Sequence, residues 1–109
     1  MEDCEIDSIH SNASTLIREM PTEKVFQLLC SKGVLTYDID GSILEMSLSQ
    51  ANEAILEFLI EKAIFVKAFQ KHAPSLFKIL LITLCEVGRC DLTELLTLGT
   101  PYKHILHLP

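Results

Sequence analysis

The sequence predicts an all-α fold, a single domain built as an antiparallel bundle of six helices. Apolar residues recur at three- and four-residue intervals along most of the 109-residue chain, which is the spacing of one helical face. Prolines and glycines interrupt that pattern where helices would begin or end. Hydrophobic residues make up 49% of the chain and charged residues 22%, a balance typical of a packed globule.

The first two predicted helices meet at Pro21, which ends the first because proline disfavours the helical conformation of the preceding residue. We expect Thr22 to cap the second helix and Gly33 to stop it. The apolar face of the first helix comprises Ile6, Ile9, Ala13, Leu16, Ile17 and Met20. The core side of the second comprises Val25, Phe26, Leu28 and Leu29.

Residues 34–48 are open to two interpretations. A hairpin could turn at Asp40-Gly41, or a short helix capped by Thr36 could tolerate Gly41 at a cost of about 1 kcal/mol. A hairpin isolated among helices would have no sheet to join and would be marginally stable. We therefore favour the helix.

Three further helices complete the bundle. The fourth is predicted over residues 49–72, and Pro74 opens a fifth that ends at Gly88. The fifth has almost no polar face, so we expect it at the centre of the bundle. Asp91 would cap the sixth, whose apolar residues are Leu92, Leu95 and Leu96, and residues 98–109 would form a tail.

Net charge argues against a nucleic-acid partner, because 15 acidic residues outnumber 9 basic ones and a phosphate backbone needs a basic surface. The acidic N-terminus lacks the apolar core of a signal peptide, and the apolar stretch Ile79–Ile82 is too short to cross a membrane. We therefore expect a cytoplasmic protein without a membrane partner. Cys4, Cys30, Cys85 and Cys90 form no CxxC pair, which favours free thiols.

No catalytic constellation is visible. A cysteine nucleophile needs a histidine within hydrogen-bond reach, and Cys30 and Cys85 lie in apolar helical runs. His104 and His107 have a spacing that two metal ligands could use, but no third ligand stands near them. We therefore expect no enzyme activity, no metal and no cofactor.

Several segments together resemble the caspase-recruitment domain (CARD) of the death-domain superfamily. They are Leu16-Ile17-Arg18-Glu19-Met20 at the end of the first helix, Phe26, and the corner Lys32-Gly33-Val34-Leu35-Thr36. Toward the end, Phe77, Leu84 and Gly88 precede Asp91-Leu92-Thr93-Glu94-Leu95-Leu96, in the order the family shows. The likeness extends over about residues 3–97. It implies a bundle of the death-fold, Greek-key type over residues 1–97.

The resemblance also implies a function: homotypic contacts with another CARD-containing protein that recruit or restrain caspases in apoptosis or inflammatory signalling. In such contacts an acidic face around helices two and three docks on a basic face of helices one and four. The matching acidic residues are Glu19, Glu23, Asp38, Asp40 and Glu45, and the basic ones are Arg18, Lys62, Lys67 and Lys71. Because Arg18 is the only Lys or Arg of the first helix, we expect the preferred partner to present the basic side.

Other interpretations stay open. A helix-turn-helix or winged nucleic-acid-binding domain would be a different class, supported only by the strip Lys67-Gln70-Lys71. A death-effector or pyrin module would share the bundle and differ in helix three. A head-to-tail contact would permit self-association. As a complete protein the chain would be an adaptor or a decoy, and as a fragment it could precede a caspase or a nucleotide-binding scaffold.

Overall fold

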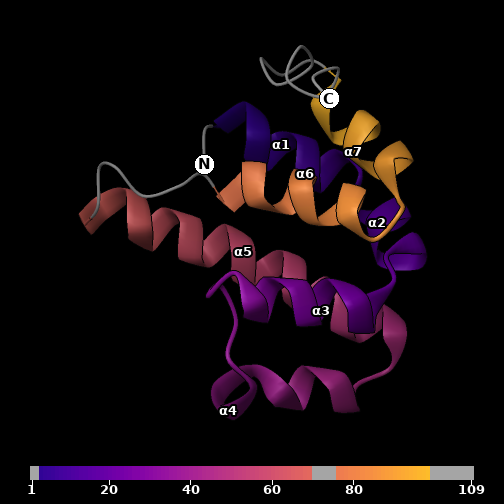
Figure 1. Cartoon of the computed structure of the whole chain (residues 1–109). Coiled ribbons are helices and arrows are strands. Elements are labelled where there is room, and N and C mark those ends of the chain that lie inside the picture. Colours follow the sequence, from indigo (N-terminus) through magenta and orange to yellow (C-terminus); the bar gives the residue numbers. More distant parts are fainter. Residues whose placement is uncertain (1–2, 70–75, 99–109) are drawn as a thin grey trace.

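The computed structural model describes residues 3–69 and 76–98, and every regular element within these ranges is helical (Figure 1). This confirms the prediction of an all-α fold. The elements are α1 (Asp3–Ser11), α2 (Ala13–Glu19), α3 (Thr22–Ser31), α4 (Tyr37–Asp40), the 3₁₀ helix η1 (Gly41–Glu45), α5 (Leu48–Phe69), α6 (Leu76–Glu86) and α7 (Cys90–Thr97). The pair α1 and α2 occupies the place of one predicted helix, and so does the pair α4 and η1. The helices of the described residues therefore follow the order of the six predicted helices.

The first predicted helix is divided in two at Asn12, whose backbone leaves the helical region at φ −106° and ψ 9°. The Asn12 side-chain amide donates to the Ser8 carbonyl oxygen (2.8 Å), a local bond of the kind that competes with regular helix. The division lets the two halves pack on different neighbours. The Ser8 hydroxyl on α1 donates to the Leu96 carbonyl of α7, whereas α2 lies against α5.

Glycines stop α3 and α6 as predicted. Gly33 and Gly88 have φ of +77° and +85°, a left-handed conformation that other residues adopt only with strain. After α3, the Gly33 N–H donates to the Cys30 carbonyl and the Val34 N–H to the Leu29 carbonyl, and an equivalent pair of bonds closes α6. Both ends are Schellman motifs.

Of the three predicted N-caps, Thr22 and Asp91 are wrong and Thr36 has the predicted position. Pro21 precedes α3, and the hydroxyl of Thr22 is buried and bonded to another helix. Asp91 lies in the first turn of α7, and its carboxylate pairs with Arg89. Thr36 does precede α4, but its hydroxyl makes no cap bond. In each case the side chain lies within hydrogen-bond distance of another polar group instead: Asn52 for Thr22, Arg89 for Asp91 and Asp40 for Thr36.

Residues 37–45 are helical, which excludes the hairpin alternative for this segment. Gly41 adopts ordinary right-handed values, φ −59° and ψ −24°, so the helix passes through it and tightens into η1. Figure 1 shows the α4–η1 segment running alongside α3 before the chain turns into α5.

Helix α6 contributes heavily to the core, as its sequence predicts, and contacts α3, α5 and α7. Its buried apolar side chains are Leu76, Phe77, Leu80, Leu81 and Leu84. They pack with residues of the other helices, among them Leu16, Phe26, Leu29, Leu35, Ile55, Leu59, Leu92 and Leu96. Ile82 faces outward on α6 at 44% exposure. Pro74, the predicted start of this helix, lies outside the described residues.

One buried polar side chain joins three helices. Asn52 of α5 donates from Nδ2 to the carbonyl oxygens of Ile17 (2.9 Å) and Met20 (3.1 Å) at the end of α2. Its Oδ1 accepts a hydrogen bond from the Thr22 hydroxyl at the start of α3 (2.7 Å). Carbonyls at a helix C-terminus have no partner within the helix, so Asn52 satisfies groups that burial would otherwise leave unpaired. The corner between α2 and α3 is thereby held on α5.

We expect Asn52→Leu to lower the free energy of unfolding by about 2–4 kcal/mol, because it leaves a buried hydroxyl and two carbonyls without this partner. Gln50→Leu, at an exposed position on the same helix, should change it by no more than about 0.5 kcal/mol. Urea unfolding followed by far-UV circular dichroism measures both. Equal midpoints for the two variants would contradict the role assigned to Asn52.

Candidate interaction surface

Four carboxylates that the sequence predicts as partner contacts are exposed. Glu19 ends α2, Glu23 lies in the first turn of α3, Asp38 lies in α4 and Glu45 ends η1. We call this set, Glu19, Glu23, Asp38 and Glu45, the acidic edge. Glu23, Asp38 and Glu45 lie on α3 and on the α4–η1 segment, which runs alongside it (Figure 1), and Glu19 ends the helix that directly precedes α3.

Asp40, the fifth predicted acidic residue, does not belong to this surface. Its side chain is only 9% exposed, and Oδ2 accepts a hydrogen bond from the backbone N–H of Thr36 (2.8 Å), with the Thr36 hydroxyl 3.5 Å away. The carboxylate thus satisfies a donor at the start of α4, where a negative charge also favours the helix dipole. Spacing along the sequence gave Asp38 and Asp40 the same role, and their burial separates them.

The predicted basic face is only partly present among the described side chains. Arg18 is exposed on α2. Lys62 is not free, because Nζ donates to the Val34 carbonyl oxygen (2.7 Å) and lies 5.4 Å from the centroid of the Phe58 ring. Lys62 therefore holds the connection after α3 against α5. The side chain of Lys67 and the whole of Lys71 fall outside the described part of the chain.

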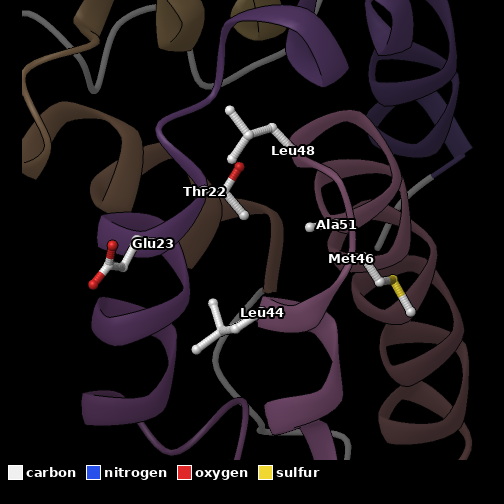
Figure 2. Close-up of a pocket in the computed structure, with 6 residues that line it drawn as sticks. All are labelled: Thr22, Glu23, Leu44, Met46, Leu48 and Ala51. Atoms are coloured by element: carbon white, nitrogen blue, oxygen red, sulfur yellow. The ribbon is translucent and has the colours of Figure 1, made fainter.

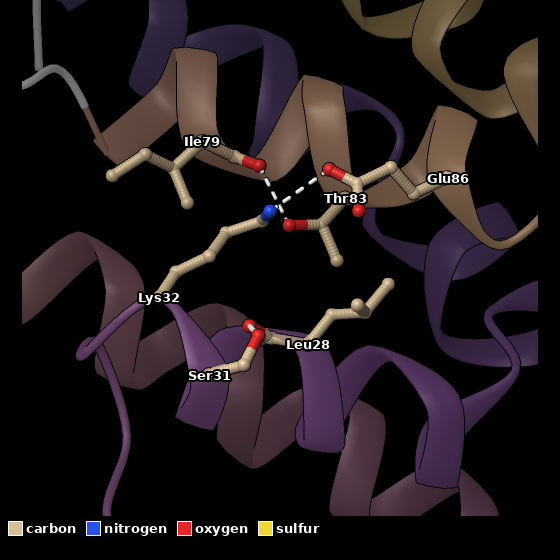
Figure 3. Close-up of polar contacts among 6 residues, drawn as sticks. All are labelled: Leu28, Ser31, Lys32, Ile79, Thr83 and Glu86. Carbon is tan, nitrogen blue, oxygen red and sulfur yellow. Dashed lines mark hydrogen bonds and ion pairs between the residues drawn. The ribbon is translucent and has the colours of Figure 1, made fainter.

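Two basic residues that sequence reasoning missed make long-range contacts. Arg89 donates from Nη1 to the Glu19 carbonyl oxygen (2.9 Å), and from Nε and Nη2 to the carboxylate of Asp91 (3.0 and 2.9 Å). The hydrogen bond from this guanidinium lowers the pKa of Asp91. Figure 3 shows Lys32, at the end of α3, reaching Glu86 on α6 (2.8 Å). Arg89 and Glu19 are 70 residues apart in the sequence, and Lys32 and Glu86 are 54 apart. No local pattern in the sequence therefore indicates either contact.

These contacts have an electrostatic consequence. Lys32, Lys62 and Arg89 direct their positive groups to partners within the chain, and each acceptor lies on another element or connection. The carboxylates of the acidic edge instead lie at exposed positions. On the described surface near α3 the four carboxylates therefore outnumber the exposed cations Arg18 and Lys24.

A shallow groove lies between the first turn of α3 and the connection from η1 to α5 (Figure 2). Its volume is about 310 Å³, and its lining residues are Thr22, Glu23, Leu44, Met46, Leu48 and Ala51. Sequence reasoning did not find it. The available signal was the alternation of apolar and polar residues in Leu44-Glu45-Met46-Ser47-Leu48, which here follows neither a strand nor a helical core face.

The four cysteines are free thiols. The pKa values of two of them, Cys30 and Cys90, are raised, which disfavours the thiolate form. Burial, followed by the negative charge of Asp40, raises the pKa of Cys30. A hydrogen bond with Cys85, followed by burial, raises the pKa of Cys90. A cysteine nucleophile needs the opposite shift, because the thiolate is the reactive species.

Neither a metal-binding cluster nor a membrane-spanning helix is present among the described residues. Within them, no three or more His, Cys, Asp or Glu side chains are grouped so that they could hold a metal ion. No helix there has both the length and the apolar character needed to cross a membrane. His104 and His107 lie outside this part of the chain.

Comparison with known proteins gives no relative: no protein-family model, curated protein or solved structure matches the chain. The likeness to caspase-recruitment domains therefore stays a prediction from the sequence. The structure establishes the coarser description, an all-helical chain over the described residues.

The two aspartates of α4 provide a matched test of the surface. We expect Asp40→Ala to lower the free energy of unfolding by about 1–2 kcal/mol, because the Thr36 N–H loses its acceptor. Asp38→Ala removes an exposed charge and should change stability by less than about 0.5 kcal/mol. Urea unfolding measures both, and a larger loss from Asp38→Ala would overturn this division of roles.

Proposed function

We propose that this chain is a cytoplasmic protein-interaction module of the caspase-recruitment type, without enzymatic activity of its own. It would make homotypic contacts with another such domain and thereby recruit or restrain caspases in apoptosis or inflammatory signalling. The observation that carries the proposal is the acidic edge, four exposed carboxylates on neighbouring helical segments. The resemblance of the sequence to recruitment domains supplies the class of partner.

The backbone beneath part of the acidic edge is firmly held. The Glu19 carbonyl accepts a hydrogen bond from Arg89, and Thr22, directly before Glu23, is bonded to the buried amide of Asn52. A charged surface on a fixed backbone is suited to recognition because little conformational entropy is lost when a partner binds. Opposite charges on the partner would accelerate encounter and set the register of docking.

The charge distribution also favours one polarity of contact. This chain would supply the acidic side, and the partner a basic side rich in Arg and Lys, because Lys62 is engaged within the chain and Arg18 is the exposed member of the predicted basic face in the described residues. A contact between two different faces is heterologous, and it extends into rings or filaments if each domain carries both faces. We therefore expect self-association to be weaker than binding to a basic partner.

The winged form of the nucleic-acid-binding alternative is disfavoured. A winged domain would need the hairpin in residues 34–46, and this segment forms α4 and η1. The strip that supported a recognition helix, Lys67-Gln70-Lys71, lies outside the described side chains. No observation favours this function over the interaction module. A death-effector or pyrin module differs from the proposed one in subfamily and not in mode of action.

Charge reversal tests the acidic edge. We expect the triple variant Glu23→Lys, Asp38→Lys and Glu45→Lys to bind a purified recruitment domain with a basic face at least about tenfold more weakly than the native chain. Its binding should also depend less on salt, because fewer charges are screened. Isothermal titration calorimetry at low and at physiological ionic strength measures both effects.

The matched control places the same three reversals at exposed positions elsewhere: Asp7→Lys on α1, Glu57→Lys on α5 and Glu94→Lys on α7. It changes net charge equally and should retain most of the affinity. If both variants lose affinity to the same extent, attraction is general and the acidic edge is not a specific surface. Unchanged binding of the first variant would remove the proposal.

A further inference from the structure

Three large apolar side chains are left in solvent along the turn from η1 into α5. Leu44 is 39% exposed, Met46 43% and Leu48 72%. Exposing one such residue is ordinary, but three within five positions beside a groove form an apolar patch of the kind that marks interaction sites. In Figure 2, Leu44 and Leu48 lie at two ends of the groove, with Thr22 and Ala51 between them.

The groove has a distinct chemistry. Its lining is apolar except for Thr22 and Glu23, and Glu23 is its only ionisable residue. A second exposed carboxylate, Glu45, does not line the groove but lies between the lining residues Leu44 and Met46 in the sequence. A complementary ligand would therefore combine a bulky apolar group with positive charge close to it. The volume of about 310 Å³ is at the small end of ligand pockets, which suits an anchoring side chain better than a whole cofactor.

The fold narrows the form that such a ligand can take. The described part of the chain has no strand whose edge an extended peptide could join, which disfavours binding by strand addition. No aromatic residue lines the groove, which disfavours a polyproline ligand, and no arginine or lysine lines it to hold a phosphate. An amphipathic helix laid against an apolar groove remains, and Met46 gives the patch a side chain that adapts to different partners.

We propose that this groove binds a basic amphipathic α-helix of a partner protein. A large apolar side chain of that helix would pack between Leu44 and Leu48, and Arg or Lys about one turn away would pair with Glu23 and Glu45. The inference rests on the proposed function only in that Glu23 and Glu45 belong to the acidic edge. It adds an apolar anchor, and its ligand is a single helix and not a folded recruitment domain.

The chain itself provides a clean readout, because it contains no tryptophan. The probe is a synthetic amphipathic helix of about four turns with one Trp at the centre of its apolar face and Arg on both flanks. Burial of this Trp in the groove should shift its emission to the blue, and titration with the native chain gives the affinity. Two control peptides are matched to this probe. In one, Glu replaces the Arg residues, and in the other, Ala replaces the apolar residues other than Trp.

We expect the Arg peptide to bind, and the Glu peptide to bind at least about tenfold more weakly. The double variant Leu44→Ser and Leu48→Ser should weaken the Arg peptide by about tenfold or more, because apolar anchors dominate the affinity of such contacts. Ile82→Ser is the matched control, since Ile82 is 44% exposed on α6 and does not line the groove. It should leave the affinity unchanged.

A reciprocal charge exchange makes the assignment sharper. Glu23→Lys with Glu45→Lys should weaken the Arg peptide and restore binding of the Glu peptide, an outcome that damage to the fold would not produce. Far-UV circular dichroism and urea midpoints establish that each variant is folded. In amide NMR spectra the native chain should show shifts at Thr22, Leu44, Leu48 and Ala51 when the Arg peptide is added.

Three outcomes would overturn the inference. The Arg peptide could bind equally well to the Leu44→Ser and Leu48→Ser variant, its amide shifts could map to another face, or light scattering could show the native chain occupying its own groove as a dimer that the variant abolishes. These failures are distinct from failure of the proposed function. If the Arg peptide does not bind but a folded recruitment domain binds in a charge-dependent way, the groove proposal alone is refuted. If the Arg peptide binds but the recruitment domain does not, the recruitment function alone is refuted.

Discussion

The buried amide of Asn52 is the contact on which the arrangement of the N-terminal half depends. It lies on the longest helix and bonds to the end of α2 and the start of α3, so one side chain sets the angle at which the chain turns at Pro21. Apolar packing alone is non-directional and would allow these helices to slide. A fully satisfied polar group in the core permits one arrangement, because any other leaves its partners unpaired.

Three positive charges of the described residues bind groups elsewhere in the fold. Lys62 stabilises the connection after α3, Lys32 links α3 to α6, and Arg89 bridges α7 to the end of α2. Each of these bonds joins two parts of the fold, which adds to the limited apolar packing of a small core. Near α3 the exposed carboxylates Glu19, Glu23, Asp38 and Glu45 outnumber the exposed cations Arg18 and Lys24, and this excess is the physical basis of the proposed preference for a basic partner.

The acidic edge and the apolar groove meet at the start of α3, where Glu23 belongs to both. Such a combination separates two tasks in binding. Charge increases the rate of encounter and selects the sign of the partner, whereas a desolvated apolar anchor governs how long the complex persists. Neither feature requires a catalytic group, and the pKa values of the Cys30 and Cys90 thiols are raised by burial and, for Cys90, first by a hydrogen bond with Cys85.

Local signals in the sequence were sufficient for the helical class, for the stops at Gly33 and Gly88, and for the apolar face of α6, because each depends on residues a few positions apart. They failed for the caps at Thr22 and Asp91, for the division at Asn12, and for the roles of Asp40 and Lys62. Packing brings Thr22 and Lys62 to partners far along the chain. Asp91 and Asp40 instead bond to nearby groups, Arg89 and the Thr36 N–H, and local spacing does not decide among such competing partners. Whether a charged side chain is a surface group or forms an internal bond depends on which backbone atoms, near or distant in the sequence, the fold brings within about 3 Å of it.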